Sequence, residues 1–234
     1  MLLGTQSSSV RSLPIFEVAL VIVATYFVFQ FLAAASLIAF GDAPTLIIGE
    51  LLILVVPLVY LLGKKVNVWG YVRLNLKPKF VLIGLGCGGL LLFLNLLVSD
   101  VLTYFLGTSN AVEASNKLIV GLSVSPSGLV AVGSSLVLAG VCEEFAFRGF
   151  LQNSIFRSLS SGKSPRLASA VAIVIAAAVF GIFHFDPQGV YTISAFVSGL
   201  ALGLIYYRWN YTASATAHAS MNLIVLALLL LGIA

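Results

Sequence analysis

Seven long apolar segments make up most of this 234-residue chain and restrict what it can fold into. Each contains about 20 residues or more with few charges, which is the length that a helix needs to cross the hydrocarbon core of a bilayer. We place them at residues 14–40, 45–63, 80–106, 128–156, 166–185, 189–207 and 212–233. The sequence therefore predicts an all-α fold, a polytopic membrane helix bundle of about seven transmembrane helices around a polar cavity. An eighth helix remains an alternative, within the first segment or between residues 107 and 127.

The composition agrees with a membrane protein and argues against other classes. Hydrophobic residues make up 60% of the chain and charged residues 9%, whereas a soluble domain has about 25% charged residues. No long basic tract accompanies the net charge of +4, so we expect the lipid bilayer, and no nucleic acid, as a partner. Cys87 and Cys142 both lie within apolar segments, which favours buried thiols over a disulfide or a metal pair. The first segment is too long for the core of a signal peptide, and we expect it to be retained.

The charges between these segments alternate along the chain. The basic connections are the N-terminus and three later loops, and they contain Arg11, Lys64, Lys65, Arg73, Lys77, Lys79, Arg157, Lys163, Arg166 and Arg208. The connections between them are acidic or nearly neutral. Because Lys and Arg are retained on the cytoplasmic side, this pattern predicts a multi-pass protein of the cell membrane with a cytoplasmic N-terminus and a C-terminus outside. We interpret Trp69 and Tyr71, within the longest basic loop, as aromatic residues at the membrane interface.

Two adjacent carboxylates, Glu143 and Glu144, interrupt the fourth apolar segment. A charge near the centre of a bilayer costs about 2.5 kcal/mol or more, so ionisable residues there indicate a function. Arg148 lies one turn beyond Glu144, and residues four apart share a helix face whereas adjacent residues diverge by about 100°. We therefore expect Glu144 to pair with Arg148, both in a supporting role, and Glu143 to have no local partner. Such a desolvated carboxylate can exchange a proton with water near neutral pH.

The two histidines of the chain, His184 and His218, lie near the ends of later apolar segments. Phe180, to which we give a supporting role, precedes His184 by one turn, and Asn222 follows His218 by one turn. If these side chains face one cavity, an imidazole could shuttle a proton and an amide could stabilise a developing oxyanion. Glu143 would then activate a water molecule against a peptide carbonyl. The lack of a serine or cysteine nucleophile motif favours this route over an acyl-enzyme.

The same residues leave a metal-dependent alternative open. Glu143, His184 and His218 are a legitimate ligand set for a catalytic zinc ion, although the chain has no HExxH motif. A Glu143 side chain bound to zinc could not also serve freely as the base, so the two schemes compete. We favour the scheme that requires no cofactor.

Three motifs, in order, resemble those of a known family. Residues 143–149, EEFAFRG, are similar to the EExxxR motif of the CAAX protease and bacteriocin-processing family, which includes the type II CAAX prenyl endopeptidases and the Abi proteins. The spacing of Phe180 and His184 resembles the FxxxH motif of that family, and the spacing of His218 and Asn222 resembles its HxxxN motif.

The resemblance implies an intramembrane endopeptidase that acts on a membrane-associated or lipidated substrate, such as a prenylated CAAX-type protein. It implies that Glu143 and His184 handle the nucleophilic water, and that His218 and Asn222 stabilise the oxyanion. Members of the family have been described as metalloprotease-like. We accordingly divide the chain into three motif-free spans at residues 1–127 and a catalytic region at residues 128–234.

Two hypotheses for a different class of function remain. In a proton-coupled transporter, the glutamate pair and the histidines would form a proton relay. A non-catalytic immunity or scaffold protein could retain the same fold. Transporters commonly contain two repeated halves, whereas the motif residues here are confined to the second half, which favours the enzyme. Glu17 and Glu50, in the first half, we interpret as residues near the membrane interface.

One expectation conflicts with a shared site. In straight spans, Glu143 falls near mid-membrane, His218 falls within two turns of the cytoplasmic end, and His184 falls near the outer end of its helix. The three side chains could not meet in that arrangement. A shared site therefore requires tilted or broken helices, or different helix boundaries between residues 157 and 190.

Overall fold

The computed structural model describes residues 12–162 and 164–233, so Arg11 and Lys163 lie outside the described residues. In this part of the chain the regular elements are all helical, and seven helical segments are long and apolar enough to cross a membrane. The seven are α1 (Ile15–Phe40), α2 (Asp42–Gly63), α4 (Pro78–Leu106), a continuous rod (Pro126–Leu159), α8 (Pro165–Phe183), α9 (Val190–Arg208) and α10 (Tyr211–Leu230). The predicted all-α bundle with seven spans is confirmed.

An eighth span is absent from the described residues. The stretch between α4 and the rod forms α5 (Asn110–Ser123), a helix of 14 residues in which no residue is buried. It is shorter than the roughly 20 residues that a span needs. The first apolar segment forms the single helix α1 of 26 residues.

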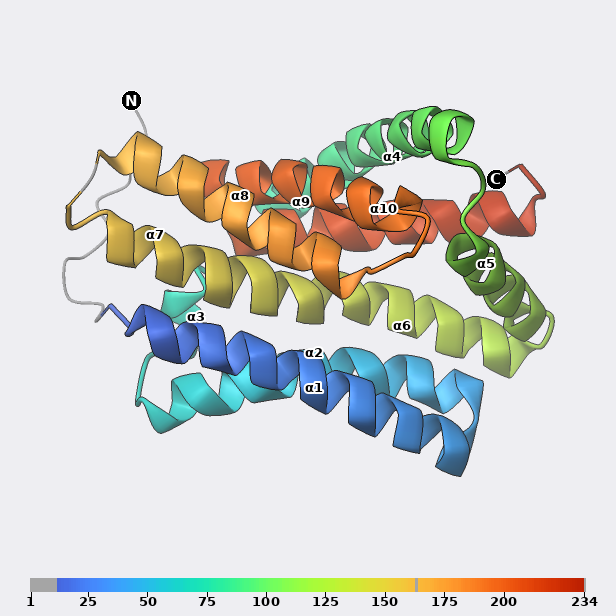
Figure 1. Cartoon of the computed structure of the whole chain (residues 1–234), viewed down its shortest axis with the longest axis horizontal. Helices are drawn as coiled ribbons and strands as arrows, with labels where there is room; N and C mark the ends of the chain where they lie inside the picture. The colour runs from blue at the N-terminus through green and yellow to red at the C-terminus, as the bar shows by residue number, and fades with distance from the viewer. Residues whose placement is uncertain (1–11, 163, 234) are drawn as a thin grey trace.

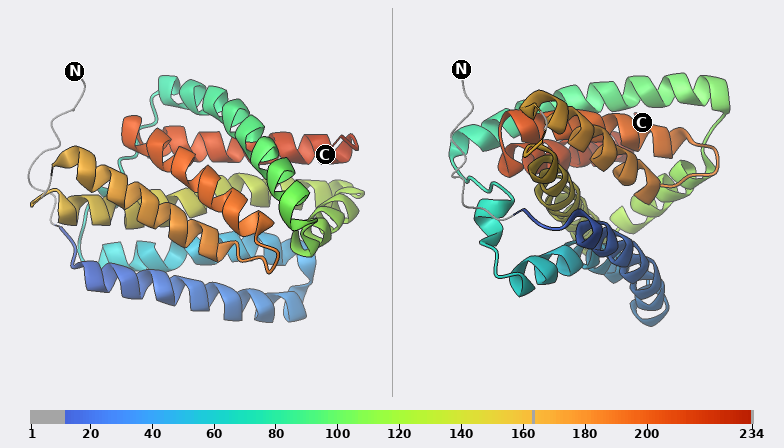
Figure 2. Two further views of the ribbon diagram at one scale, coloured as in Figure 1. Left: turned by 45° about the horizontal axis from the view of Figure 1, so that its top comes forward. Right: turned by 60° about the vertical axis from the view of Figure 1, so that its left-hand side comes forward.

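The rod is the central element of the bundle. It consists of α6 (Pro126–Glu144), the π-helix η1 (Phe145–Gln152) and α7 (Asn153–Leu159), which follow one another without a break. In Figures 1 and 2, α1 and α2 lie on one side of the rod, and α4, α8, α9 and α10 lie on the other. Both carboxylates of the EExxxR motif therefore lie inside the bundle, where helices from both halves of the chain surround them.

Polar side chains determine where three helices of the second half begin. In each case the side-chain oxygen accepts a hydrogen bond from a backbone N–H of the first helical turn, which would otherwise lack a partner. The capping residues are Ser125 for α6, Ser164 for α8 and Asn210 for α10. Pro126 and Pro165 follow the two serines at the first helical position, where proline costs no hydrogen bond.

Glycines bring α4 and α10 close together. A Cβ atom on Gly84 would lie 2.8 Å from the Ala213 carbonyl oxygen, and one on Gly88 would lie 2.9 Å from the Ala217 carbonyl oxygen. A Cβ atom on Gly86 or Gly89 would meet nothing within 4 Å. The face of α4 that carries Gly84 and Gly88 therefore allows the backbones of α4 and α10 to approach closely, as small residues do in packed membrane helices.

The basic loop between α2 and α4 folds back into the bundle. It contains the short helix α3 (Val68–Tyr71), and the side chain of Tyr71 is fully buried. The Tyr71 hydroxyl shares a hydrogen bond of 2.7 Å with Ser154, and the amide of Asn153 donates to the Tyr71 carbonyl at 2.7 Å. The interpretation of Tyr71 as an interfacial residue is therefore wrong, because this side chain is part of the packing against α7. Trp69 is exposed.

Candidate active site

The two motif carboxylates lie where α6 passes into the π-helix. Glu143 and Glu144 are the last residues of α6, and Arg148 lies in η1, all of whose residues are buried. Turns of π-helix are rare and frequently occur at functional sites. The local change in helix geometry therefore coincides with the residues that the motif singles out.

Glu144 is fully bonded. Its Oε1 lies 2.9 Å from Nη1 of Arg148 and 3.2 Å from Nδ1 of His218, and its Oε2 accepts a hydrogen bond from the Ser214 hydroxyl. The side chains of Glu144 and Arg148 are completely buried. A buried ion pair is sustained only when further hydrogen bonds satisfy its remaining polar atoms. The predicted pair of Glu144 and Arg148 is present, and His218 and Ser214 satisfy its carboxylate, whereas Nε and Nη1 of Arg148 have no hydrogen-bond partner among the described residues.

Glu143, in contrast, has no direct hydrogen bond to either histidine. Its Oε1 lies 4.0 Å from Nε2 of His184, and its Oε2 lies 3.9 Å from Nε2 of His218. These separations exceed the range of a direct hydrogen bond. The buried Oε2 atom has no hydrogen-bond partner. The structure thus brings Glu143 and both histidines together and leaves this carboxylate available.

The hydrogen bonds of the two imidazoles fix which nitrogen faces Glu143. Nδ1 of His184 lies 2.8 Å from the carbonyl oxygen of Phe180, which can only accept, so this nitrogen carries a hydrogen. Nδ1 of His218 likewise donates to the carboxylate of Glu144. In the neutral imidazoles, Nε2 is then an acceptor directed at Glu143.

The expectation that these groups could not meet is wrong, and the length of the rod is the first reason. The rod contains 34 residues and extends past residue 156, where the predicted segment ends. Glu143 therefore lies about 24 Å before the end of the rod at Leu159, at a rise of 1.5 Å per residue. His184 follows the last residue of α8, about 28 Å from its start at Pro165. The two residues are consequently at similar levels.

The position of α10 is the second reason. The Trp209 carbonyl, just before α10, accepts a hydrogen bond of 2.8 Å from Arg73, two residues beyond α3. The same short helix binds Asn153, which lies about 9 Å before the end of the rod. Because α10 begins this far inside the bundle, its eighth residue, His218, reaches Glu143.

The ring of Phe180 lies beside both imidazoles and the Arg148 guanidinium. Its ring centroid lies 4.5 Å from that of His184 and 5.9 Å from that of His218, and the Arg148 guanidinium lies 4.3 Å from the ring centroid. The ring also packs edge-on against Phe147 at 5.1 Å. An aromatic face beside a guanidinium is favourable. The arrangement is consistent with the supporting role assigned to Phe180.

Asn222 lies one turn beyond His218 on α10. Its Nδ2 donates to the Leu136 carbonyl of α6 at 3.3 Å. Leu136 is about two turns before Glu143 in the rod. The amide is therefore engaged with backbone in this structure, and its role at an oxyanion stays a prediction.

Three further residues belong to this neighbourhood and were missed by sequence reasoning. Ser214 lies four residues before His218 on the same helix face, which is a signal that could have identified it. Glu50 of α2 has a buried carboxylate oxygen without a hydrogen-bond partner and interacts electrostatically with Glu143, so its interpretation as an interfacial residue is wrong. Tyr191 of α9 places its ring 5.1 Å from that of His184. No spacing in the sequence links Glu50 or Tyr191 to the motifs.

The site matches a zinc-ligand set in residue type but not in spacing. Two ligands at 2.0–2.1 Å from a tetrahedral zinc ion lie about 3.3 Å apart. Glu143 lies 4.0 Å from Nε2 of His184 and 3.9 Å from that of His218. In residues 12–162 and 164–233, no three His, Cys, Asp or Glu side chains are grouped so that they could hold a metal ion. The metal-free scheme stays a prediction that chelation can test.

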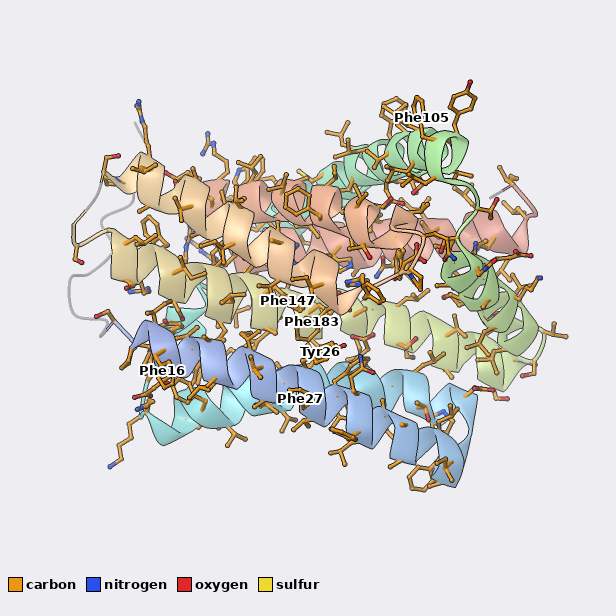
Figure 3. All side chains as sticks on the ribbon, viewed as in Figure 1. Phe16, Tyr26, Phe27, Phe105, Phe147 and Phe183 are labelled. Carbon is orange, nitrogen blue, oxygen red and sulfur yellow. The ribbon has the colours of Figure 1, made fainter. Side chains whose placement is uncertain are left out.

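An apolar groove of about 630 Å³ lies next to the site, between α1 on one side and α7 and α8 on the other. Tyr26 and Phe183 line it and pack edge-on against each other at 5.1 Å. Phe183 also contacts Phe147 at 4.9 Å, and Phe147 contacts Phe180. Figure 3 shows Tyr26, Phe147 and Phe183 together where the end of α8 approaches α1. A chain of aromatic rings thus connects the groove with the site.

A comparison with known proteins finds a match in the part of the chain that contains the motifs. The family model described as type II CAAX prenyl endopeptidase Rce1-like matches residues 125–224, a range that includes every motif residue from Glu143 to Asn222. No curated protein and no solved structure matches the chain significantly. The matched family is a protease family. Residues 125–224 are therefore similar to the Rce1-like type II CAAX prenyl endopeptidases, in agreement with the family that the three motifs indicate.

Proposed function

We propose that this protein is an intramembrane endopeptidase in which Glu143 activates a water molecule for attack on a peptide bond. One observation carries the proposal. The Glu143 carboxylate lies 3.9–4.0 Å from Nε2 of both histidines and is hydrogen-bonded to neither. Glu144, next to it, is neutralised by Arg148 and cannot take this role without breaking a buried ion pair.

The separation between Glu143 and His184 suits one bridging water. An oxygen atom about 2.8 Å from two acceptors that are 4.0 Å apart makes an angle of roughly 90° with them. A water there can donate one hydrogen to Glu143 and the other to Nε2 of His184, and its lone pairs remain directed away from both. In the attack, the water oxygen bonds to the carbonyl carbon and its proton passes to Glu143.

The remaining steps use the other motif residues. The carbonyl oxygen becomes an oxyanion, and His218 can stabilise it by donating from Nε2 when both of its ring nitrogens carry hydrogen. When the C–N bond breaks, the leaving nitrogen takes the proton that Glu143 accepted. Asn222 would reach the oxyanion only after its bond to Leu136 opens. Water, a peptide bond and these side chains balance the reaction without a cofactor.

The apolar groove supports a lipid-linked or strongly apolar substrate. It is lined almost wholly by apolar side chains and leads to the site through Phe183 and Phe147. An isoprenoid or acyl chain in the groove would place the attached peptide near Glu143. A prenylated CAAX-type peptide is therefore the first substrate to test.

The test is cleavage of that peptide by the purified protein in detergent. The wild-type protein is expected to cleave it, whereas the Glu143→Ala and His184→Ala variants are not. Glu113→Ala is the matched control, because Glu113 is an exposed residue of α5 paired with Lys117, and this variant should cleave at the wild-type rate. Unchanged cleavage by Glu143→Ala would overturn the mechanism. A proton flux into liposomes that Glu143→Gln abolishes, without any proteolysis, would favour the transporter instead.

A further inference from the structure

Glu50 is an acidic residue within the apolar helix α2, and the mechanism above does not use it. Its Oε2 atom is buried and has no hydrogen-bond partner in the part of the chain that the structure describes. An ionisable side chain is costly inside a membrane helix, and such residues usually face the interior of the bundle and serve a function. The residues that match the family model, 125–224, do not include it. Glu50 is therefore a candidate functional group that the three motifs do not indicate.

Helix geometry turns Glu50 toward the rod. Gly49 faces α1, since a Cβ atom there would lie 3.2 Å from the Phe29 ring. The next residue, Glu50, points about 100° away around the helix. Ile53, about one turn after Glu50, is buried in the core cluster that also contains Phe145 of η1. Because α2 packs against α6 and η1, Glu50 lies on the side of α2 that faces the rod.

Glu50 and Glu143 also lie at similar depths in the bundle. Both α2 and the rod run toward the end of the bundle that holds α3 (Figure 1). Glu50 lies about 20 Å before the end of α2 at Gly63. Glu143 lies about 24 Å before the end of the rod at Leu159. The two carboxylates interact electrostatically, and the side chain of Tyr191 interacts electrostatically with both. The two acidic groups are therefore near each other.

Both carboxylates have an oxygen that needs a hydrogen-bond donor. Among residues 12–162 and 164–233, neither Oε2 of Glu143 nor Oε2 of Glu50 has a partner, and both atoms are buried. Nε2 of His218 lies 3.9 Å from the Glu143 oxygen, which is too far for a hydrogen bond, and it is an acceptor in the neutral ring. Buried waters typically bind to polar groups that would otherwise be unsatisfied. One water has two hydrogens and can donate one to each carboxylate.

We propose that Glu50 is a positioning residue of the active site, which binds a water molecule together with Oε2 of Glu143. This water is separate from the nucleophilic one, which lies at Oε1 between Glu143 and His184. With Oε2 held, Glu143 keeps Oε1 directed at the nucleophilic water, so Glu50 promotes proton transfer without contact to the substrate. The inference rests on the proposed peptidase function and extends the active site to the first half of the chain.

Substitution of Glu50 tests this role with the purified protein and the prenylated CAAX-type peptide. Glu50→Met removes the carboxylate and retains a side chain of similar length. We expect kcat to fall about 10–100-fold with little change in KM, as for the outer groups that orient metal ligands. The melting temperature should stay the same or rise, because a buried acidic group without a protein partner is removed. Glu50→Gln retains an acceptor oxygen and should recover part of the lost rate.

Two results would overturn the inference. The first is a wild-type kcat in Glu50→Met. The second is a loss of rate that accompanies a large fall in melting temperature, because that result would show a merely structural role.

Glu17→Met is the matched control. Glu17 is another glutamate of the first half, but the Tyr60 hydroxyl donates to it at 2.6 Å and Lys64 pairs with it. This variant should keep the wild-type kcat, with an unchanged or lower melting temperature. A loss of kcat equal to that of Glu50→Met would count against a specific role for Glu50.

A double-mutant cycle on the melting temperature separates this inference from the peptidase function. The effect of Glu50→Met should be more stabilising in the wild-type background than in Glu143→Gln, because two nearby acidic groups disfavour each other and Glu143→Gln already removes one. Additive changes would show that the two side chains do not interact and would overturn the inference. The cycle requires no proteolysis. Non-additive changes in a protein that leaves the peptide uncleaved would therefore contradict the peptidase function alone.

Discussion

Nε2 of His184, just after the end of α8, lies 4.0 Å from Oε1 of Glu143, near the end of α6. The Nδ1–H of the same imidazole is held by the carbonyl of Phe180, so the ring cannot turn without losing a hydrogen bond. The separation is too long for a direct bond and suits a shared water. The two adjacent glutamates therefore differ. The carboxylate of Glu144 is paired with Arg148, whereas that of Glu143 is not bonded to His184.

The buried ion pair gives a prediction about stability. Arg148→Met leaves Glu144 buried without its cation, and loss of one partner of such a pair typically costs about 3–5 kcal/mol. The double variant Glu144→Gln/Arg148→Met removes both charges and should lose less stability than the Arg148→Met variant alone. Thermal unfolding in detergent measures both effects. A double variant as unstable as the sum of the two single variants would show that the charges are not coupled.

Ser214 is predicted to contribute to stability and to kcat through its hydrogen bond to Glu144. Its hydroxyl donates to that carboxylate, and a hydrogen bond to a charged group contributes about 1.5–3 kcal/mol. Ser214→Ala should therefore lower the melting temperature and reduce kcat by disturbing His218, which bonds to the same carboxylate. Ser220→Ala is the control, since Ser220 donates to the Ala217 carbonyl of its own helix. Equal melting temperatures for Ser214→Ala and Ser220→Ala would contradict this role.

Helix packing between α4 and α10 gives a matched pair of glycine variants. Gly88→Ala places a Cβ atom 2.9 Å from the Ala217 carbonyl oxygen, and such overpacking costs about 1–3 kcal/mol. Gly89→Ala meets nothing within 4 Å and should be neutral or stabilising by up to about 1 kcal/mol, because alanine favours helix. Thermal unfolding of the two variants in parallel separates them. The prediction fails if Gly89→Ala is the more destabilised of the two.

Chelation tests the metal-free scheme. Peptide cleavage by the purified protein is expected to survive prolonged treatment with EDTA and with 1,10-phenanthroline, because in the proposed mechanism Glu143 acts on water directly. Added zinc should not raise the rate. Loss of cleavage on chelation, with recovery on addition of zinc, would instead support Glu143, His184 and His218 as metal ligands.

Much of the fold followed from hydrophobic segment length. Seven spans and their approximate limits were predictable, because a helix needs a fixed number of apolar residues to cross a bilayer. The ion pair of Glu144 with Arg148 was predictable from helical spacing, and it survives the π-helical turn between them. Contacts within a single helix depend on the spacing of residues along the chain, so the sequence alone indicates them.

Contacts between distant segments were not predictable in the same way. The depth of His218 depends on where the start of α10 lies in the bundle, and Arg73, more than a hundred residues earlier in the chain, holds that start through its hydrogen bond to the Trp209 carbonyl. Glu50 approaches Glu143 because α2 packs against α6. Neither contact leaves a pattern in a single sequence. The motifs indicated that the histidines and Glu143 should converge, while segment lengths alone argued against it.

The kinetics of Glu143→Gln test the central claim most directly. Glutamine retains the size of the side chain and cannot accept the proton of the attacking water. Loss of a general base typically lowers the rate about 10²–10⁴-fold. With the prenylated CAAX-type peptide, we predict a fall in kcat of that order, little change in KM, and a melting temperature close to that of the wild type. A Glu143→Gln variant that cleaves the peptide with the wild-type kcat would contradict the account.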